Sequence, residues 1–131
     1  RVITTVAGNG SFGRDGDDGP ATRASLAGPA GIALVPEKDG KLTIFIADYY
    51  NGLVRAVGPD GIIRNVGDEA HVAFGAPSRV AFGPRRRWLY VADSSHDQIV
   101  ALNIPQVARN PFTIAPRALA RAPAPTRKAG R

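Results

Sequence analysis

Short apolar runs alternate with turn-forming residues over positions 1–104, a pattern typical of antiparallel strands. The run at 42–47 is almost continuously apolar, which predicts a strand that is buried on both faces. The run at 53–57 alternates around Arg55, which predicts a strand with one wetter face. Asp-Gly pairs between the runs favour tight hairpin turns. A helix would have to absorb Gly or Pro at almost every turn, so we expect an all-β fold built from antiparallel meanders.

An internal repeat organises these runs. An Ala-Asp pair that ends at Asp48 recurs with its end at Asp93, 45 positions later, and each pair closes the second apolar run of its unit. A period of about 40–50 residues that carries three or four short strands is typical of a propeller blade. The repeat predicts a four-stranded blade over 29–67 and an incomplete blade over 77–104.

Residues 1–7 predict an outer strand without a blade of its own, because Ile3-x-x-Val6 repeats the fourth-strand pattern Ile63-x-x-Val66. Two blades leave sheet edges and a blade face uncovered, and propellers typically close with about four to eight blades. We therefore expect further blades, supplied by the remainder of a longer chain or by identical subunits. Since the chain has no Met and opens in a strand, we also expect that it does not begin at a natural translation start.

The motifs of the first repeat are specific enough to compare with a known family. They are Pro-x-Gly-Ile-Ala at 29–33, Ile-Ala-Asp at 46–48, Asn-x-x-Val-Arg-x-Val at 51–57 and Gly-x-Ile-x-x-Val-Gly at 61–67. This pattern resembles the NHL repeat of bacterial β-propellers, and residues 8–28 resemble the connection between its blades. The second repeat departs from the pattern at His96, where the first has Asn, and at 100–102. The resemblance implies a partial or oligomer-completed propeller that acts as a non-catalytic scaffold and binds a protein or another ligand through its loops.

A basic tail follows the repeats. The net charge of +6 comes entirely from residues 109–131, since the positions before them are formally neutral. The tail carries no acid, and its basic residues are Arg109, Arg117, Arg121, Arg127, Lys128 and Arg131. Its Ala-, Pro- and Arg-rich composition cannot bury enough apolar area to offset the entropy of ordering, so we expect an irregular segment. Such a tail serves either as a linker or as an anchor on RNA, on an acidic protein or on anionic lipid.

The remaining composition excludes several classes of site. The absence of Cys excludes disulfides, thiolate metal sites and a cysteine nucleophile. No apolar run is long enough for a membrane helix. No Ser/His/Asp order, phosphate-binding glycine loop or paired-carboxylate motif stands out, so the sequence favours a protein without enzymatic activity. It leaves the compartment open, with a secreted or periplasmic location preferred.

Three turn segments should share one end of the blades, because the turns after the second and fourth strands of a meander lie on the same side. They carry residues that could bind a ligand: Asp15, Asp17, Asp18, Tyr49, Tyr50, Asn51, Ser94, His96 and Asp97. The three aspartates could chelate Ca²⁺, but the distal Glu of an EF-hand loop is missing, and an Asx-rich turn that bonds its own backbone is the simpler interpretation. Asp48 and Asp93 recur at equivalent positions, so we expect structural carboxylates that cap backbone N–H groups of the following turn.

Two other functions compete with the scaffold hypothesis. One is a metal-dependent lyase or hydrolase of the type that cleaves peptidyl-α-hydroxyglycine on a related propeller with histidine-bound Zn²⁺. The histidines here are His71 and His96, whereas a zinc site needs three or four ligands, so no cofactor and no metal site are predicted. The other is single-stranded RNA binding by a basic turn together with the tail. The residues for that function are Arg85, Arg86, Arg87, Arg127 and Lys128.

Overall fold

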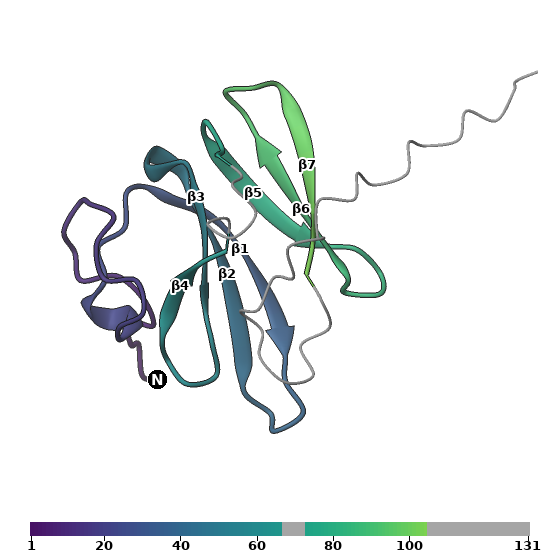
Figure 1. Ribbon diagram of the computed structural model, residues 1–131. Coiled ribbons are helices and arrows are strands. Elements are labelled where there is room, and N and C mark those ends of the chain that lie inside the picture. The colour runs from purple at the N-terminus through teal and green to yellow at the C-terminus, as the bar shows by residue number, and fades with distance from the viewer. Residues whose placement is uncertain (67–72, 105–131) are drawn as a thin grey trace, which may run out of the picture.

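The computed structural model describes residues 1–66 and 73–104, which form two antiparallel sheets (Figure 1). The first sheet has four strands in sequential order: β1 (Pro29–Pro36), β2 (Leu42–Asp48), β3 (Leu53–Val57) and β4 (Ile63–Asn65). The second has three strands: β5 (Pro77–Phe82), β6 (Trp88–Asp93) and β7 (Gln98–Asn103). In this part of the chain the helices are two single 3-10 turns, η1 (Ala21–Arg23) and η2 (Tyr49–Asn51), and neither could cross a membrane. The prediction of an all-β fold of antiparallel meanders is confirmed.

The two sheets repeat each other in register. Pro29 pairs with Asp48 at the start of β1, and Pro77 pairs with Asp93 at the start of β5. In both sheets the register shifts directly after this proline. The paired residues of β2 and β3 therefore recur 45 positions later in β6 and β7, apart from Leu42, and the first six residues of β1 recur 48 positions later in β5. The repeat seen in the sequence is a repeat of the structure.

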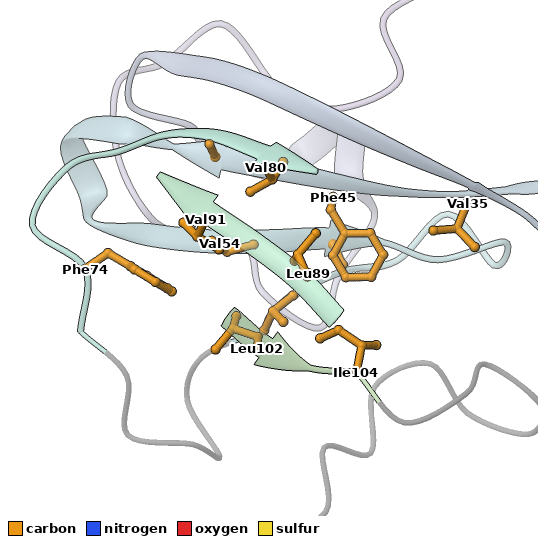
Figure 2. Packing of buried hydrophobic residues seen from close by; sticks show 12 residues of the cluster. Val35, Phe45, Val54, Phe74, Val80, Leu89, Val91, Leu102 and Ile104 are labelled. Carbon is orange, nitrogen blue, oxygen red and sulfur yellow. The ribbon is translucent and has the colours of Figure 1, made fainter. Parts of the chain in front are cut away.

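The main core lies between the two sheets (Figure 2). Phe45 of β2 is only 1% exposed and shares one apolar cluster with Leu89 and Val91 of β6. Its ring meets Phe82 of β5 edge-on, with 5.1 Å between the ring centroids. Burial of such side chains contributes about 1.5–3 kcal/mol each, so this cluster is the main attachment of one sheet to the other.

The far face of the first sheet is covered in part by residues 8–28. Ile46 and Ile63 form a second apolar cluster with Ala21 and Ala24. Because Phe45 and Ile46 point to opposite faces and both are buried, β2 is enclosed on both sides, as its continuous apolar pattern predicts.

The predicted outer strand over 1–7 is not formed. Its apolar side chains are exposed, Val2 by 88%, Ile3 by 98% and Val6 by 60%. A strand needs a partner edge, and the outer edge of β4 is already occupied by residues 8–28. Asp18 N–H donates to the Ile63 carbonyl at 2.8 Å, and Ile63 N–H donates to the Gly19 carbonyl at 3.0 Å. The basic tail with Arg127 and Lys128 lies outside the described residues, as does His71.

Candidate functional site at the loop end of the sheets

Arg55 fastens residues 8–28 to the first sheet. Its side chain is fully buried, and its Nη2 and Nε donate to one oxygen of Asp17 at 2.8 and 3.1 Å. Nη1 donates to the Ser25 carbonyl at 2.6 Å and lies 3.6 Å from the Asp48 carboxylate. The prediction that Arg55 marks a wetter face is therefore wrong, because the long connection before the sheet folds over it. Asp17 serves as the counter-ion of this buried guanidinium.

The other two aspartates of this loop also have backbone roles. The Asp15 N–H donates to the Ser25 hydroxyl at 2.9 Å, and the Asp15 carbonyl accepts the Ser25 N–H at 3.0 Å. Asp18 adopts a left-handed conformation, with φ at 62°, at the point where the loop joins the edge of β4. Within residues 1–66 and 73–104 no three acidic or histidine side chains gather as a metal ion would require. The aspartates thus form an ordered turn rather than a converging set of ligands.

Asp48 and Asp93 hold the connections that precede their sheets. Asp48 is fully buried, and its Oδ1 accepts the Ala27 N–H at 2.7 Å. Asp93 is equally buried, and its Oδ1 accepts the Gly75 and Ala76 N–H groups, both at 3.0 Å. The sequence predicted caps on the turn that follows each carboxylate. The backbone groups lie instead in the connection before the sheet, because the chain enters β1 and β5 directly beside the end of the neighbouring strand.

In each unit a side chain of the following turn forms a hydrogen bond with the second oxygen of the carboxylate. Asn51 donates from Nδ2 to Asp48 Oδ2 at 2.7 Å and also lies 2.7 Å from the Gly13 carbonyl, to which it donates. At the equivalent position His96 places Nδ1 2.8 Å from Asp93 Oδ2. A carboxylate only accepts, so Nδ1 carries a proton, and Nε2 lies on a side chain that is 52% exposed. Where the first unit has Asn51, which bonds both Asp48 and the Gly13 carbonyl, the second unit therefore has a half-exposed imidazole.

Several opposing influences act on the ionisation of Asp93. Burial raises its pKa, whereas hydrogen bonds from the Ala76 N–H, His96, Gln98 and the Gly75 N–H lower it, and the result is a pKa below the ordinary value of 3.8. The folded state therefore favours the ionised carboxylate. Its contribution to stability is present above pH 3.8 and is lost as the pH falls through the lower pKa of the folded protein.

We expect Asp93→Asn to make the protein less sensitive to acid. Below about pH 4 the free energy of unfolding of the wild type should fall more steeply than that of the variant, because only the wild type must protonate this carboxylate. Urea titrations at a series of pH values compare the two slopes. Asp60, whose pKa is lowered mainly by a hydrogen bond from Arg64, is present in both proteins and cancels in the comparison. Identical slopes would refute the role given to Asp93.

An exposed aromatic cluster forms where Phe12 of residues 8–28 meets Tyr49 and Tyr50 of η2. The Tyr50 ring lies 5.9 Å from the Phe12 ring and 5.0 Å from the Tyr49 ring, centroid to centroid. Phe12 is 76% exposed and Tyr50 69% exposed, although Tyr50 N–H donates to the Ala27 carbonyl at 2.9 Å and so has a fixed backbone. Sequence reasoning selected Tyr49 and Tyr50 but missed Phe12, whose only signal is an aromatic residue inside a glycine-rich loop.

The turn after β2, at 49–52, and the turn after β6, at 94–97, lie at the same end of the sheets, as predicted. The connection at 73–76 lies against both turns. Gly52 approaches the Phe74 carbonyl so closely that a Cβ atom would lie 2.5 Å from it, and a Cβ on Gly75 would overlap the Ser95 hydroxyl. Ser94 forms a hydroxyl pair with Ser78 at 2.7 Å. Asp97 is exposed beside a shallow hollow of about 370 Å³ lined by Ala92, Asp93, Ser94, Asp97, Gln98 and Ile99.

The arginine turn lies at the opposite end of the second sheet, since Arg87 precedes β6 and Ser94 follows it. Arg85, Arg86 and Arg87 are all exposed. Arg86 has a left-handed backbone, with φ at 49°, and its N–H donates to the Gly83 carbonyl at 2.9 Å. This turn is the part of the RNA hypothesis that falls within the described residues.

Comparison with known proteins supports the fold and leaves the function open. No family model matches the chain. It is 28% identical over 112 residues to the Arabidopsis thaliana chloroplastic protein Suppressor of Quenching 1, covering 78% of this chain and 11% of that protein. Among solved structures it resembles a candidate phosphatase from Bacteroides thetaiotaomicron, with a TM-score of 0.57, 20% identity and coverage of 72% of this chain and 25% of the other. It also resembles an auxiliary nutrient binding protein from Bacteroides ovatus, with a TM-score of 0.58, 19% identity and coverage of 68% and 25%. The chain thus spans a quarter or less of the proteins it resembles.

Proposed function

We propose that this chain is a two-sheet segment of an NHL-type β-propeller and that it acts as a non-catalytic scaffold, which binds a protein at its loop end. The exposed aromatic pair of Phe12 and Tyr50, where residues 8–28 meet η2, carries this proposal. Tyr and Phe are enriched where proteins bind one another, because they supply a large contact area with little loss of side-chain entropy. Phe12 and Tyr50 stand out into solvent from two segments, residues 8–28 and η2, whose backbones are hydrogen-bonded to their surroundings, so binding would cost little ordering.

The repeated carboxylates support the scaffold part of the proposal. Asp48 and Asp93 tie the connection before each sheet to the end of its second strand. Repetition of the same bond in both units is explained by architecture, since a catalytic group would be needed once. The common register and the packing of consecutive sheets face to face are features expected of propeller blades.

A photo-crosslinking experiment tests the binding surface. A photoreactive phenylalanine derivative placed at Tyr50 in the natural protein should capture a discrete protein partner in its native cells. The same derivative at Lys38, an exposed position in the turn at the opposite end of the first sheet, serves as the matched control. Equal labelling at both positions, or none at Tyr50, would remove the proposal.

Once a partner is captured, Tyr50→Ala should weaken its binding by about tenfold or more, which is the usual cost of truncating an interface aromatic. The fold should be unaffected, because most of the Tyr50 side chain is in solvent. Calorimetric titration of the purified pair measures the affinity, and circular dichroism checks the fold. An unchanged affinity for both Tyr50→Ala and Phe12→Ala would contradict a role for this cluster.

A further inference from the structure

The chain contains a fourth-strand sequence without a sheet and, within residues 73–104, a sheet without a fourth strand. Residues 1–7 match the fourth-strand pattern, since Ile3 and Val6 correspond to Ile63 and Val66. In the first sheet those two positions are 0% and 5% exposed, whereas Ile3 is 98% exposed. The outer edge of β7 pairs with no strand in the described part of the chain. Residues 1–7 therefore lack a sheet, and over residues 73–104 the sheet β5–β7 lacks the fourth strand that such a segment could supply.

The uncovered faces of the two sheets are also complementary, because each one matches a face that is buried in the other sheet. Val80 and Leu89 of the second sheet are 6% and 0% exposed because the first sheet covers them. Their counterparts in the first sheet are Ile32 and Ile44, and Ile32 is 62% exposed. Residues 8–28 cover the rest of this face, so the first sheet presents an open strip along β1, where Leu34 is also 51% exposed, of the type that is buried in the second sheet.

The open face of the second sheet is the matching half. Phe45 and Val54 of the first sheet are 1% and 0% exposed under the second sheet. Their counterparts Tyr90 and Ile99 are 38% and 67% exposed. The contact inside the chain joins unlike faces, head to tail, so its two partner faces remain open at opposite ends of the pair. In Figure 1 residues 1–7 lie on the side of the first sheet that faces away from β5–β7.

A hollow marks where the turn of another sheet would sit. The turn after β2 places Gly52, with φ at 64°, against the Phe74 carbonyl. The counterpart of Gly52 is Asp97, which adopts the same left-handed conformation with φ at 49°. The counterpart of Phe74 is Leu26, which lines a hollow of about 760 Å³ together with Ala7 and other residues of the loop. The lining of the hollow runs from Thr5 to Pro29 at the start of β1, which is where the turn of a neighbouring sheet would lie.

We propose that copies of this chain associate head to tail, so that β5–β7 of one copy covers the open face of the first sheet of the next. Residues 1–7 of the second copy then pair with the free edge of β7 as its fourth strand. The inference rests on the proposed blade architecture and does not depend on the partner surface at Tyr50. A head-to-tail contact repeats until it closes, so two, three or four copies give a ring of about four to eight sheets.

The repeat also fixes the register of the new strand pair. In the first sheet Ala56 lies opposite Arg64, and their counterparts are Ala101 in β7 and Thr4 in the N-terminal segment. Ala101 of one copy should therefore lie directly opposite Thr4 of the next. Opposed Cα atoms in an antiparallel pair are about 4.5–5.5 Å apart, which is within reach of a disulfide.

Cysteine pairing tests the contact directly, because the chain has no Cys of its own. The double variant Thr4→Cys/Ala101→Cys should form disulfide-linked oligomers under mild oxidation, up to a closed ring. Lys41→Cys/Ala101→Cys, with its first cysteine in an exposed turn away from the contact, should stay largely monomeric on a non-reducing gel. Failure of the first pair to link, or equal linking by both pairs, would overturn the proposal.

A charge variant gives an independent reading on the particle mass. Wild-type protein should have a mass in solution of two, three or four times 13.8 kDa. Ile3→Arg should convert it to the monomer, because the counterpart Ile63 is fully buried. Thr4→Arg should leave it assembled, because Arg64 is the natural residue at the counterpart position. A wild-type monomer at all concentrations would mean that another segment or another protein covers these faces, and it would overturn self-association while leaving crosslinking at Tyr50 to test the proposed function.

Discussion

Replacing Asp48 with alanine is expected to lower the free energy of unfolding by about 3–5 kcal/mol, because it removes a buried carboxylate beside a buried guanidinium. Asp48 and Arg55 are both fully buried, with 3.6 Å between the charged groups. Loss of the carboxylate leaves Asp17, which is partly exposed, as the remaining counter-ion. It also leaves the Ala27 N–H without its acceptor. One substitution thus removes a partner from both the Arg55 guanidinium and the Ala27 N–H.

Asp93→Ala is the matched control. Asp93 is just as buried and accepts two backbone N–H groups, but its position in the second sheet has Val100 where the first has Arg55. Its loss should cost about 1–3 kcal/mol, the usual penalty for leaving buried donors unpaired. Urea unfolding of the monomeric Ile3→Arg background keeps association out of the measurement. Equal losses for the two variants would show that the buried Arg55 charge does not depend on Asp48.

The local pattern was sufficient to predict the strands. Period-two alternation and the apolar runs located β2 and β3 to within one residue, and the recurring Ala-Asp pair located the two units that contain the other strands, because each of these signals acts over neighbouring positions. The continuous apolar run in β2 also predicted its burial on both faces. These features need no knowledge of distant parts of the chain.

Contacts between distant segments were the source of the errors. Arg55 alternates as a solvent-facing residue would, yet it is buried because Asp17, 38 positions earlier, folds back over it. The caps made by Asp48 and Asp93 were assigned to the wrong side, since the accepting oxygen and its N–H partner are 21 and 17 positions apart. The strand over 1–7, expected without a blade of its own, is not formed in the single chain, because a strand requires a free edge beside it. The periodicity of a sequence carries no information on such contacts between distant positions.

Gly52→Ala should be the most disruptive single methyl addition in the described part of the chain. With φ at 64°, an alanine would pay about 1–2 kcal/mol for the left-handed backbone. Its Cβ would also lie 2.5 Å from the Phe74 carbonyl oxygen, a contact with backbone that cannot rotate away. Overpacking of this kind adds about 1–3 kcal/mol. We expect a total loss of about 2–5 kcal/mol, concentrated where the first sheet meets the connection to the second.

Gly61→Ala separates strain from contact. Gly61 has φ at 76°, but a Cβ there would meet nothing within 4 Å, so only the backbone cost of about 1–2 kcal/mol applies. Trp88, the single tryptophan, lies in β6 and reports on the second sheet by fluorescence, while circular dichroism reports on both sheets. In Gly52→Ala the fluorescence transition should move to lower urea than the dichroism transition, because the shifted Phe74 connection loosens the second sheet first. Coincident transitions and equal losses for the two glycine variants would mean that the close approach at Gly52 does not couple the sheets.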